Sequence, residues 1–192
     1  MSSISATAKN LLLAGMVPDT VSLHTAFPGT TGASECSGGG YARKSIAFGA
    51  PSGGVALQTG SSVFTVAQTV RWVGYWQGST WLFACPAGGA TPKNFTIDPP
   101  NDTVNSPLHG WSAGQQIVMF NGTVPGGTTE GQVLYVRDVT ANTFKVAATL
   151  GGAAIDMTTA PSWGAVIAAI TEYVYPVAGT FTLENSTIVI PD

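Results

Sequence analysis

Short apolar runs rich in β-branched and aromatic residues, separated by Gly, Pro and Asn, make up most of the sequence after residue 20. Runs of this length and composition are typical of strands, and their regular punctuation indicates an all-β sandwich or barrel. In the first half of the chain the expected strands are Val21–Thr25, Arg43–Phe48, Gly54–Leu57, Val63–Val66, Val70–Trp76 and Trp81–Cys85.

Helical spacing is clearest in residues 3–15. Ser3 or Ser5 can cap a helix there, Gly15 offers a stop, and Pro18 follows. The apolar side of this helix comprises Ile4, Ala8, Leu11, Leu12 and Leu13. We therefore expect one short N-terminal helix ahead of the strands.

The composition changes after residues 86–92, and the next forty residues are polar and rich in turns around one expected strand, Gln116–Phe120. The pattern then predicts a hairpin over Gln132–Val139 and Thr143–Ala147, and a further turn and strand at residues 150–156. Alternating aliphatic residues return at Val166–Val174 and Thr180–Ile190.

These changes predict two domains. Residues 1–92 and 166–192 would form a discontinuous, jelly-roll-like β-sandwich platform, and residues 93–165 an inserted small β-barrel or β-sandwich. Insertions into loops whose ends lie close together are well tolerated, which makes this arrangement physically reasonable.

Charged residues make up 9% of the chain, against roughly 25% in ordinary soluble domains. A nearly neutral surface of small residues suits packing against copies of the chain or other coat subunits, although a secreted β-protein with a polar, uncharged surface has the same composition. The net charge of −3 and the scatter of seven basic residues indicate no nucleic-acid partner.

No basic segment followed by an apolar run opens the sequence, and no run reaches the length of a membrane span. We therefore expect synthesis in a cytosol and no membrane partner. Cys36 and Cys85 lie in different contexts, and two cysteines do not make a disulfide framework or a metal-ligand spacing.

No catalytic constellation is evident in the sequence. His24 in a strand and His109 in a loop are expected to make ordinary hydrogen bonds, and Asp98 and Asp102 flank a proline turn. The glycines at 38–40 are not followed by the residues of a phosphate-binding loop. We expect no catalytic residue, cofactor or metal site, and a hydrolase is the least favoured class.

The densest aromatic group lies in the expected hairpin over residues 70–85. Alternation places Trp72, Gly74 and Trp76 on one face of the strand. Such a stripe can stack on sugar rings, but it more often forms sheet core, and we favour core. A carbohydrate-binding module remains the alternative from another class, and it would depend on Trp72, Trp76, Trp81 and Trp111.

The long span between the strand ends Val21–Leu23 and Ser45–Phe48 consists mainly of Gly, Pro, Ser and Thr. It cannot form a core, and its backbone groups need hydrogen-bond partners. We predict a positive φ for Gly29 or Gly32, so that a β-branched replacement would disrupt the loop.

This span resembles the signature of a family of small tailed-bacteriophage virion proteins, which are usually labelled tail fibre or minor tail proteins. The resemblance extends to the hairpin strands Val70–Trp76 and Trp81–Pro86 and to the closing segment Gly179–Leu183. Phe27 stands where the family usually has a small acidic residue, and the inserted block itself resembles a β-module of other phage structural proteins. The motif comprises Leu23-His24-Thr25-Ala26, Pro28-Gly29-Thr30-Thr31-Gly32-Ala33-Ser34-Glu35 and Tyr41-Ala42-Arg43-Lys44.

The resemblance implies a non-enzymatic structural protein of a phage virion, made in the bacterial cytoplasm. It would be a capsid decoration or tail-associated subunit that assembles with itself, for example as a trimer, and with major capsid or tail proteins. The alternative is a carbohydrate- or receptor-binding module of the tail, whose partner would be a host surface glycan. The candidate assembly-motif residues are Leu23, His24, Thr25, Pro28, Gly29, Gly32, Tyr41 and Arg43.

Overall fold

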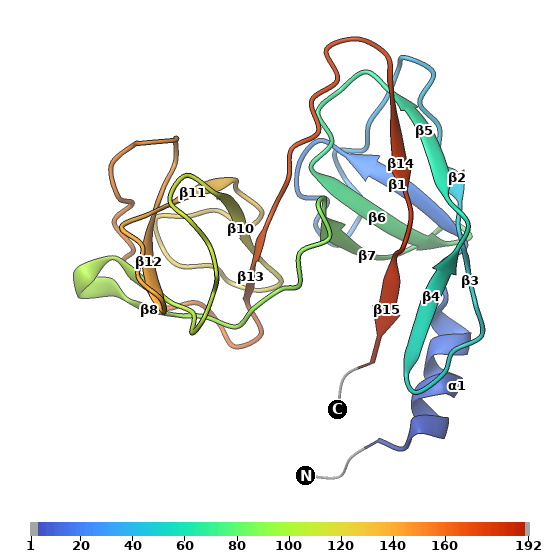
Figure 1. Ribbon diagram of the computed structural model, residues 1–192, viewed down its shortest axis with the longest axis horizontal. Helices are drawn as coiled ribbons and strands as arrows, with labels where there is room; N and C mark the ends of the chain where they lie inside the picture. The colour runs from blue at the N-terminus through green and yellow to red at the C-terminus, as the bar shows by residue number, and fades with distance from the viewer. Residues whose placement is uncertain (1–3, 191–192) are drawn as a thin grey trace. The chain divides into compact units, whose positions relative to one another are not determined.

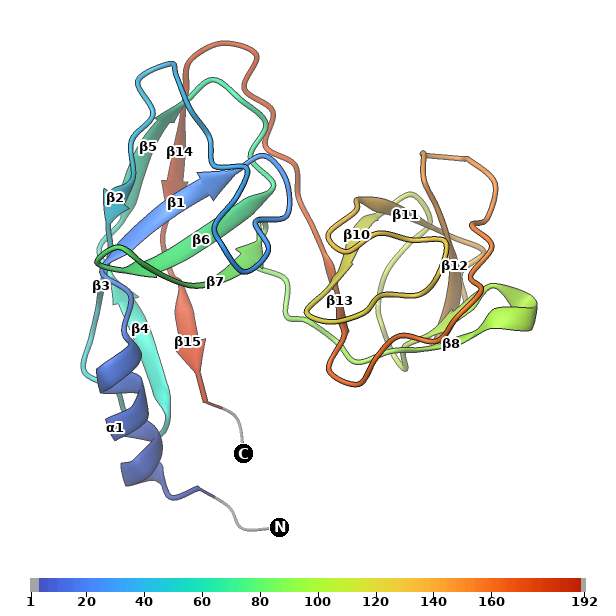
Figure 2. The same ribbon diagram turned by 180° about the vertical axis from the view of Figure 1, so that it is seen from behind.

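The computed structural model describes residues 4–190, and 37% of the chain is β-strand. The fold is all-β, with several antiparallel sheets and one short N-terminal α-helix, as the sequence predicts (Figures 1 and 2). The chain divides into two compact units. Unit 1 contains the residues up to Cys85 and those from Tyr173 onward, and unit 2 is Pro86–Glu172.

Helix α1 spans Ala6–Met16. The hydroxyl of Ser5 caps it by accepting a hydrogen bond from the Ala8 amide at 3.2 Å, which satisfies one of the free amides at the helix start. The other predicted cap, Ser3, lies outside the described residues. The helix buries Leu13 and the side chain of Lys9 against unit 1.

The first sheet of unit 1 has four strands in the order β2-β1-β6-β7. Strands β1 and β6 are antiparallel, with Thr20 opposite Trp76 and His24 opposite Trp72. The predicted hairpin over residues 70–85 is confirmed as β6 and β7. The strand bounds are β1 Thr20–His24, β2 Lys44–Ser45, β6 Trp72–Gln77 and β7 Thr80–Pro86.

Two smaller antiparallel sheets complete unit 1, in the orders β14-β5 and β15-β4-β3. In β5 burial alternates, and Phe64 packs edge-on against its cross-strand partner Phe181 with ring centroids 6.2 Å apart. The last predicted strand, Thr180–Ile190, is two strands. The bounds are β3 Ala47–Phe48, β4 Val55–Thr59, β5 Ser62–Val66, β14 Gly179–Leu183 and β15 Thr187–Val189.

Unit 2 is one antiparallel sheet in the order β13-β10-β11-β12-β9-β8. Lys93, just before β8, forms a bridge with Ile167 of β13 through two backbone hydrogen bonds of 2.8 and 2.9 Å. The two edges of the sheet therefore meet, as in a small barrel. The bounds are β8 Thr96–Asp98, β9 Thr103–Asn105, β10 Gln116–Phe120, β11 Leu134–Arg137, β12 Thr143–Ala147 and β13 Val166–Ala169.

The boundaries between the units differ from the predicted ones. We expected residues 166–192 in the platform and the insertion to begin at residue 93. Strand β13 instead pairs with β10, with Ile117 opposite Ala169, so it belongs to unit 2. The residues of β13, Val166–Ala169, are all small or aliphatic and suit a buried strand of either unit. The alternation in the sequence therefore did not show to which unit the strand belongs.

Unit 2 differs from the sequence-based expectations in two places. The turn predicted around Asp98 is confirmed as the 3-10 helix η1, Pro99–Asn101, but the short strands β8 and β9 that pair with each other across it were not predicted. The strand expected within residues 150–156 is absent. Residues 151–156 form no strand and are held partly by the Ile155 amide, which donates to the Val146 carbonyl at 2.9 Å.

Within residues 4–190, no helix is both long enough and apolar enough to cross a membrane.

Candidate functional site

The candidate site is the loop over residues 25–43, which joins β1 to β2 in unit 1. Its backbone groups find partners within the chain: the Thr25 amide donates to the Ser34 carbonyl at 2.9 Å, and the Cys36 amide donates to the Leu23 carbonyl at 2.8 Å. The Ala33 amide donates to the Pro28 carbonyl at 3.0 Å. These bonds fold the Gly- and Thr-rich span back onto β1 as a defined structure.

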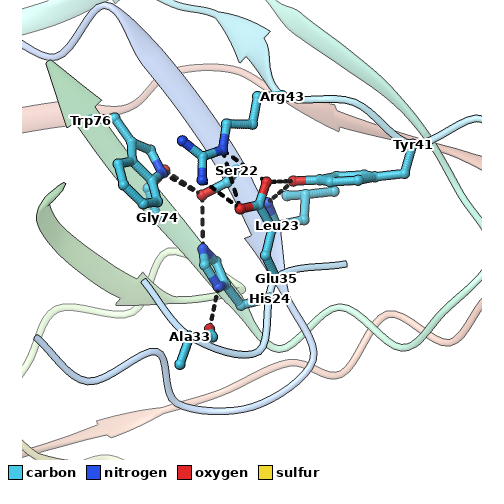
Figure 3. A network of polar contacts seen from close by, with 9 residues as sticks. All are labelled: Ser22, Leu23, His24, Ala33, Glu35, Tyr41, Arg43, Gly74 and Trp76. Atoms are coloured by element: carbon cyan, nitrogen blue, oxygen red, sulfur yellow. Dashed lines mark hydrogen bonds and ion pairs between the residues drawn. The ribbon is translucent and has the colours of Figure 1, made fainter. Parts of the chain in front are cut away.

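A chain of hydrogen bonds connects β6 through β1 to this loop (Figure 3). Trp76 Nε1 donates to Ser22 Oγ at 2.7 Å, Ser22 Oγ lies 2.7 Å from His24 Nε2, and His24 Nδ1 lies 2.7 Å from the Ala33 carbonyl oxygen. Because a carbonyl only accepts, Nδ1 carries the proton, and Nε2 of a neutral ring accepts from the Ser22 hydroxyl. Every member of the chain therefore has a partner.

The register between β1 and β6 brings these hydrogen-bonded side chains together. Ser22 and His24 are two residues apart on β1, so both side chains lie on the same face. Gly74 lies opposite Ser22 on β6, and Trp76 lies two residues further along. Burial lowers the pKa of His24 from its ordinary value, and the hydrogen bond to Ala33, which acts in the other direction, does not outweigh it. The ring is accordingly neutral near pH 7.

Beside these hydrogen bonds, an ion pair between Arg43 and Glu35 fixes the second half of the loop. Arg43 Nε donates to Glu35 Oε1 at 2.9 Å, and Arg43 Nη2 donates to Oε2 at 2.7 Å. The Tyr41 hydroxyl donates to Glu35 Oε1 at 3.0 Å and accepts from the Leu23 amide at 2.9 Å. The guanidinium also lies 3.7 Å from the ring centre of Trp76, within cation–π distance.

These contacts set the charge state of Glu35. Burial raises its pKa, but the hydrogen bonds from Arg43 and Tyr41 together lower it more, so the net pKa lies below the ordinary value. The carboxylate is therefore ionised over most of the pH range, and it holds Tyr41 and Arg43 on the same side of β1.

Two glycines allow the close packing around the network. A Cβ atom at Gly32 would lie 2.6 Å from the Trp76 ring and 2.9 Å from Trp81, and one at Gly74 would lie 2.5 Å from His24 Nε2. Gly29 has open space instead, with nothing within 4 Å of a Cβ. The prediction of positive φ is confirmed at both loop glycines, with 59° at Gly29 and 76° at Gly32.

The structure places the eight candidate motif residues on β1 and the loop, but at different depths. Leu23, His24 and Pro28 are buried, and Arg43 is exposed. The others, Thr25, Gly29, Gly32 and Tyr41, are half-buried. Much of the motif therefore shapes the loop from inside, and the surface that the loop presents is formed mainly by Thr30, Thr31, Ala33, Ser34, Ser37 and Gly38–Gly40.

The Ser22–His24 pair has the spacing of a serine hydroxyl and its general base. Both residues, however, are 0% exposed. The hydroxyl also accepts from Trp76, so the pair is part of the core and not an accessible nucleophile. We did not predict the pair from the sequence, and its one local signal is the Ser-x-His spacing on an expected strand.

The tryptophans of the proposed sugar platform are mostly internal. Trp72, Trp76 and Trp111 are buried, and Trp81 is half-buried with its ring edge-on to Trp76 at 4.9 Å. The preference for core over ligand platform is confirmed for Trp72 and Trp76. Because Trp111 is buried as well, the carbohydrate-binding alternative loses most of the indoles on which it depended. Trp163, which we did not single out from the sequence, is fully exposed.

The second histidine, His109, lies in unit 2 and makes the turn contacts that we predicted. Its Nδ1 accepts from the Trp111 amide at 3.0 Å, and its Nε2 lies 2.9 Å from the Thr140 carbonyl. Among residues 4–190, no three His, Cys, Asp or Glu side chains form a group that could hold a metal ion. Cys36 and Cys85 are both free thiols, and burial raises the pKa of Cys36 to about 11.

Comparison with protein-family models, with curated proteins and with solved structures returned no match.

Proposed function

We propose that this chain is a non-enzymatic structural protein of a tailed-phage virion. It is a capsid decoration or tail-associated subunit that assembles with itself and with other virion proteins. The supporting observation is the loop over residues 25–43, which carries the family-like motif and is held in one conformation by the His24 and Glu35 contacts. A loop that is ordered before assembly loses less conformational entropy when it packs against a neighbour.

The charge of the chain supports the same role. Only 9% of its residues are charged, and the outer surface of the loop is made mainly of Gly, Ser, Thr and Ala, with Arg43 paired to Glu35. Such surfaces repel identical neighbours weakly and bury little unpaired charge when subunits meet.

Immunogold labelling of particles of the phage that encodes the chain tests this proposal. Label on the head would support decoration, label on the tail would support a tail subunit, and particles without label would contradict a virion role. A blot of denatured particles is the control, because it detects the chain even where assembly hides the epitope from the antibody.

A second candidate function, a carbohydrate- or receptor-binding module of the tail, is favoured by Trp163 in unit 2. Its indole is fully exposed, and the loop that carries it is held by Ser162, whose amide donates to the Thr123 carbonyl at 2.8 Å. An exposed indole on a loop whose backbone is hydrogen-bonded can stack on a sugar ring.

An array of bacterial surface glycans, probed with the wild-type chain and with Trp163→Ala, tests this function. Leu150→Ala is the matched control, because Leu150 is also an exposed apolar residue of unit 2. Glycan binding that Trp163→Ala abolishes and Leu150→Ala retains would support the module, and no binding by the wild type would contradict it.

A further inference from the structure

Two loops of unit 2 adjoin the same end of its sheet. The loop over residues 121–130 follows β10, and the loop over residues 157–165 precedes β13. Strands β10 and β13 are antiparallel neighbours, with Phe120 opposite Val166. The end of one strand therefore lies beside the start of the other, and the two loops leave the sheet together. The second loop carries the exposed Trp163.

Hydrogen bonds join the two loops to each other. The Thr123 amide donates to Ser162 Oγ at 2.9 Å, and the Ser162 amide donates to the Thr123 carbonyl at 2.8 Å. A Cβ atom at Gly122 would lie 2.8 Å from Ser162 Oγ, so only a residue without a side chain allows this approach. The loops therefore form one hydrogen-bonded surface of unit 2.

Trp163 occupies the second position of a turn in this surface. The Ala165 amide donates to the Ser162 carbonyl at 3.2 Å and closes the turn. Gly164 supplies a φ of 94° at the third position, where a positive φ is characteristic of a type II turn. A Cβ at Gly164 would lie 4.0 Å from the carbonyl oxygen of Asn121, so the turn that carries the indole lies directly beside Asn121.

The Glu130 carboxylate holds the backbone at Asn121. Its Oε1 accepts hydrogen bonds from the Asn121 amide at 2.8 Å and from the Gly122 amide at 3.2 Å. Asn121 has a φ of 67°, a conformation that asparagine tolerates and glycine adopts without strain. The turn therefore does not itself require a side-chain amide. The Asn121 side chain is exposed and forms no hydrogen bond within residues 4–190.

The two loops carry a single charge between them. Glu130 is the only charged residue in residues 121–130 and 157–165. A carboxylate repels an anionic ligand, and it accepts hydrogen bonds from hydroxyl groups. The charge of this surface therefore favours an uncharged ligand that is rich in hydroxyl groups.

We propose that Asn121 and Trp163 form one binding site for uncharged glycans. The indole stacks on the face of a sugar ring, and the Asn121 amide bonds to the hydroxyl groups of that ring. A side-chain amide has one acceptor oxygen and two donor hydrogens, so it serves two neighbouring hydroxyls at once. Glu130 fixes the backbone of Asn121 and disfavours anionic sugars. This inference rests on the second candidate function, glycan binding by unit 2, and assigns its ligand class.

An array of neutral and anionic bacterial surface glycans, followed by biolayer interferometry on the members that bind, tests the site with the full chain. The wild type should bind uncharged glycans. Asn121→Gly should weaken this binding roughly three- to tenfold, because it removes the hydrogen bonds of the amide and retains a residue suited to the positive φ. Asn185→Gly is the matched control and should bind as the wild type does, because Asn185 is an exposed asparagine of unit 1 with a φ of 61°.

Glu130→Gln tests the preference for uncharged ligands. A glutamine carbonyl can still accept from the two backbone amides, whereas the negative charge is lost. The variant should therefore bind anionic glycans that the wild type rejects. Hydrogen exchange at the Asn121 and Gly122 amides checks that the loop is intact in each variant. Continued rejection of anionic glycans by an intact Glu130→Gln would overturn the role of Glu130.

Three results would overturn the site itself: a wild type that binds mainly anionic glycans, equal binding by Asn121→Gly and the wild type, or equal weakening by Asn185→Gly. The glycan-binding function fails separately. Binding that depends on Trp163 but not on Asn121 would support that function and overturn this site. A wild type that binds no glycan would contradict the function and, with it, the site.

Discussion

The two units of this protein build their interiors in different ways. In unit 2 the main buried cluster is apolar and includes Val104, Ile117, Leu134 and Phe144, and the buried His109 bonds there only to backbone groups. In unit 1 a hydrogen-bonded chain from Trp76 through Ser22 and His24 to Ala33 passes through the core beside the apolar residues. An apolar cluster depends on volume, whereas a buried polar chain also depends on geometry and protonation.

The difference also bears on the proposed assembly surface. In unit 1 the polar chain connects the sheet to the loop over residues 25–43, so core geometry determines the shape of a surface loop. Unit 2 has its own core, and the feature proposed for binding, Trp163, is on its surface. Changes in the core of unit 1 should therefore reach the proposed assembly surface, and changes in the core of unit 2 should not.

The largest expected effect is in unit 2. Phe144→Ala should lower the free energy of unfolding by about 3–5 kcal/mol, because it leaves a cavity at a fully buried ring. Chemical denaturation measures the loss, and residue-resolved hydrogen exchange assigns it. Protection should fall in β9–β12 and persist in the loop over residues 25–43. Equal loss of protection in both regions would show that the units unfold together.

Gly74→Ala should lower the free energy of unfolding by about 2–4 kcal/mol, because the added methyl group overpacks the sheet and separates Ser22 from His24. Hydrogen exchange should show the loss in β1, β6 and the loop. If the variant were as stable as the wild type, and its Thr25 amide stayed protected by the Ser34 carbonyl, residue 74 would not need to be glycine.

The two loop glycines should respond differently to the same substitution. Gly29→Ala should lower the free energy of unfolding by about 1 kcal/mol, because it brings only the strain of a positive φ. Gly32→Ala should lower it by roughly 1–3 kcal/mol more, because its methyl group also meets Trp76 and Trp81. Tryptophan fluorescence during denaturation compares the two variants, and equal losses would contradict the packing described for Gly32.

The smallest effect is the dependence on pH. His24 has a folded pKa below its ordinary value of 6.5, so the unfolded chain binds the proton more readily. The free energy of unfolding should be fully retained above pH 6.5 and fall below it, by at most about 1.4 kcal/mol per pH unit. Glu35, whose folded pKa is also lowered, adds a further loss below its ordinary value of 4.5.

Denaturation curves between pH 7.5 and 5 measure this slope. His24→Asn is the control, because it removes the titrating ring and should remove the slope between pH 6.5 and 5. A wild-type slope that persists in His24→Asn would assign the pH dependence to other groups.

Local patterns predicted much of the fold. Helix α1, strand β10 and the β6–β7 hairpin follow from the spacing of apolar residues and from the turn signal Gln77-Gly78-Ser79, of which Gly78 and Ser79 lie between the two strands. The strands β8 and β9 were missed because proline and asparagine dominate their short turn. The boundary at β13 was misplaced because its partner depends on the register with β10.

The candidate loop was predicted as a loop, with the correct backbone at Gly29 and Gly32, but its internal bonding was not. The Ser22–His24 contact arises within β1, whereas the contacts of Trp76 with Ser22 and of Gly74 with His24 require the pairing of β1 with β6. That pairing joins residues about fifty positions apart. No local pattern specifies such a pairing, so the depth of each motif residue could only come from the structure.

Quantitative mass spectrometry of purified particles tests the central claim, that this chain is a structural protein of a virion, most directly. We predict a fixed copy number per particle, on the order of hundreds for a capsid decoration protein and a small number set by the tail symmetry for a tail subunit. Particles that contain the known capsid and tail proteins in full but lack this chain, or carry it in variable trace amounts, would contradict the claim.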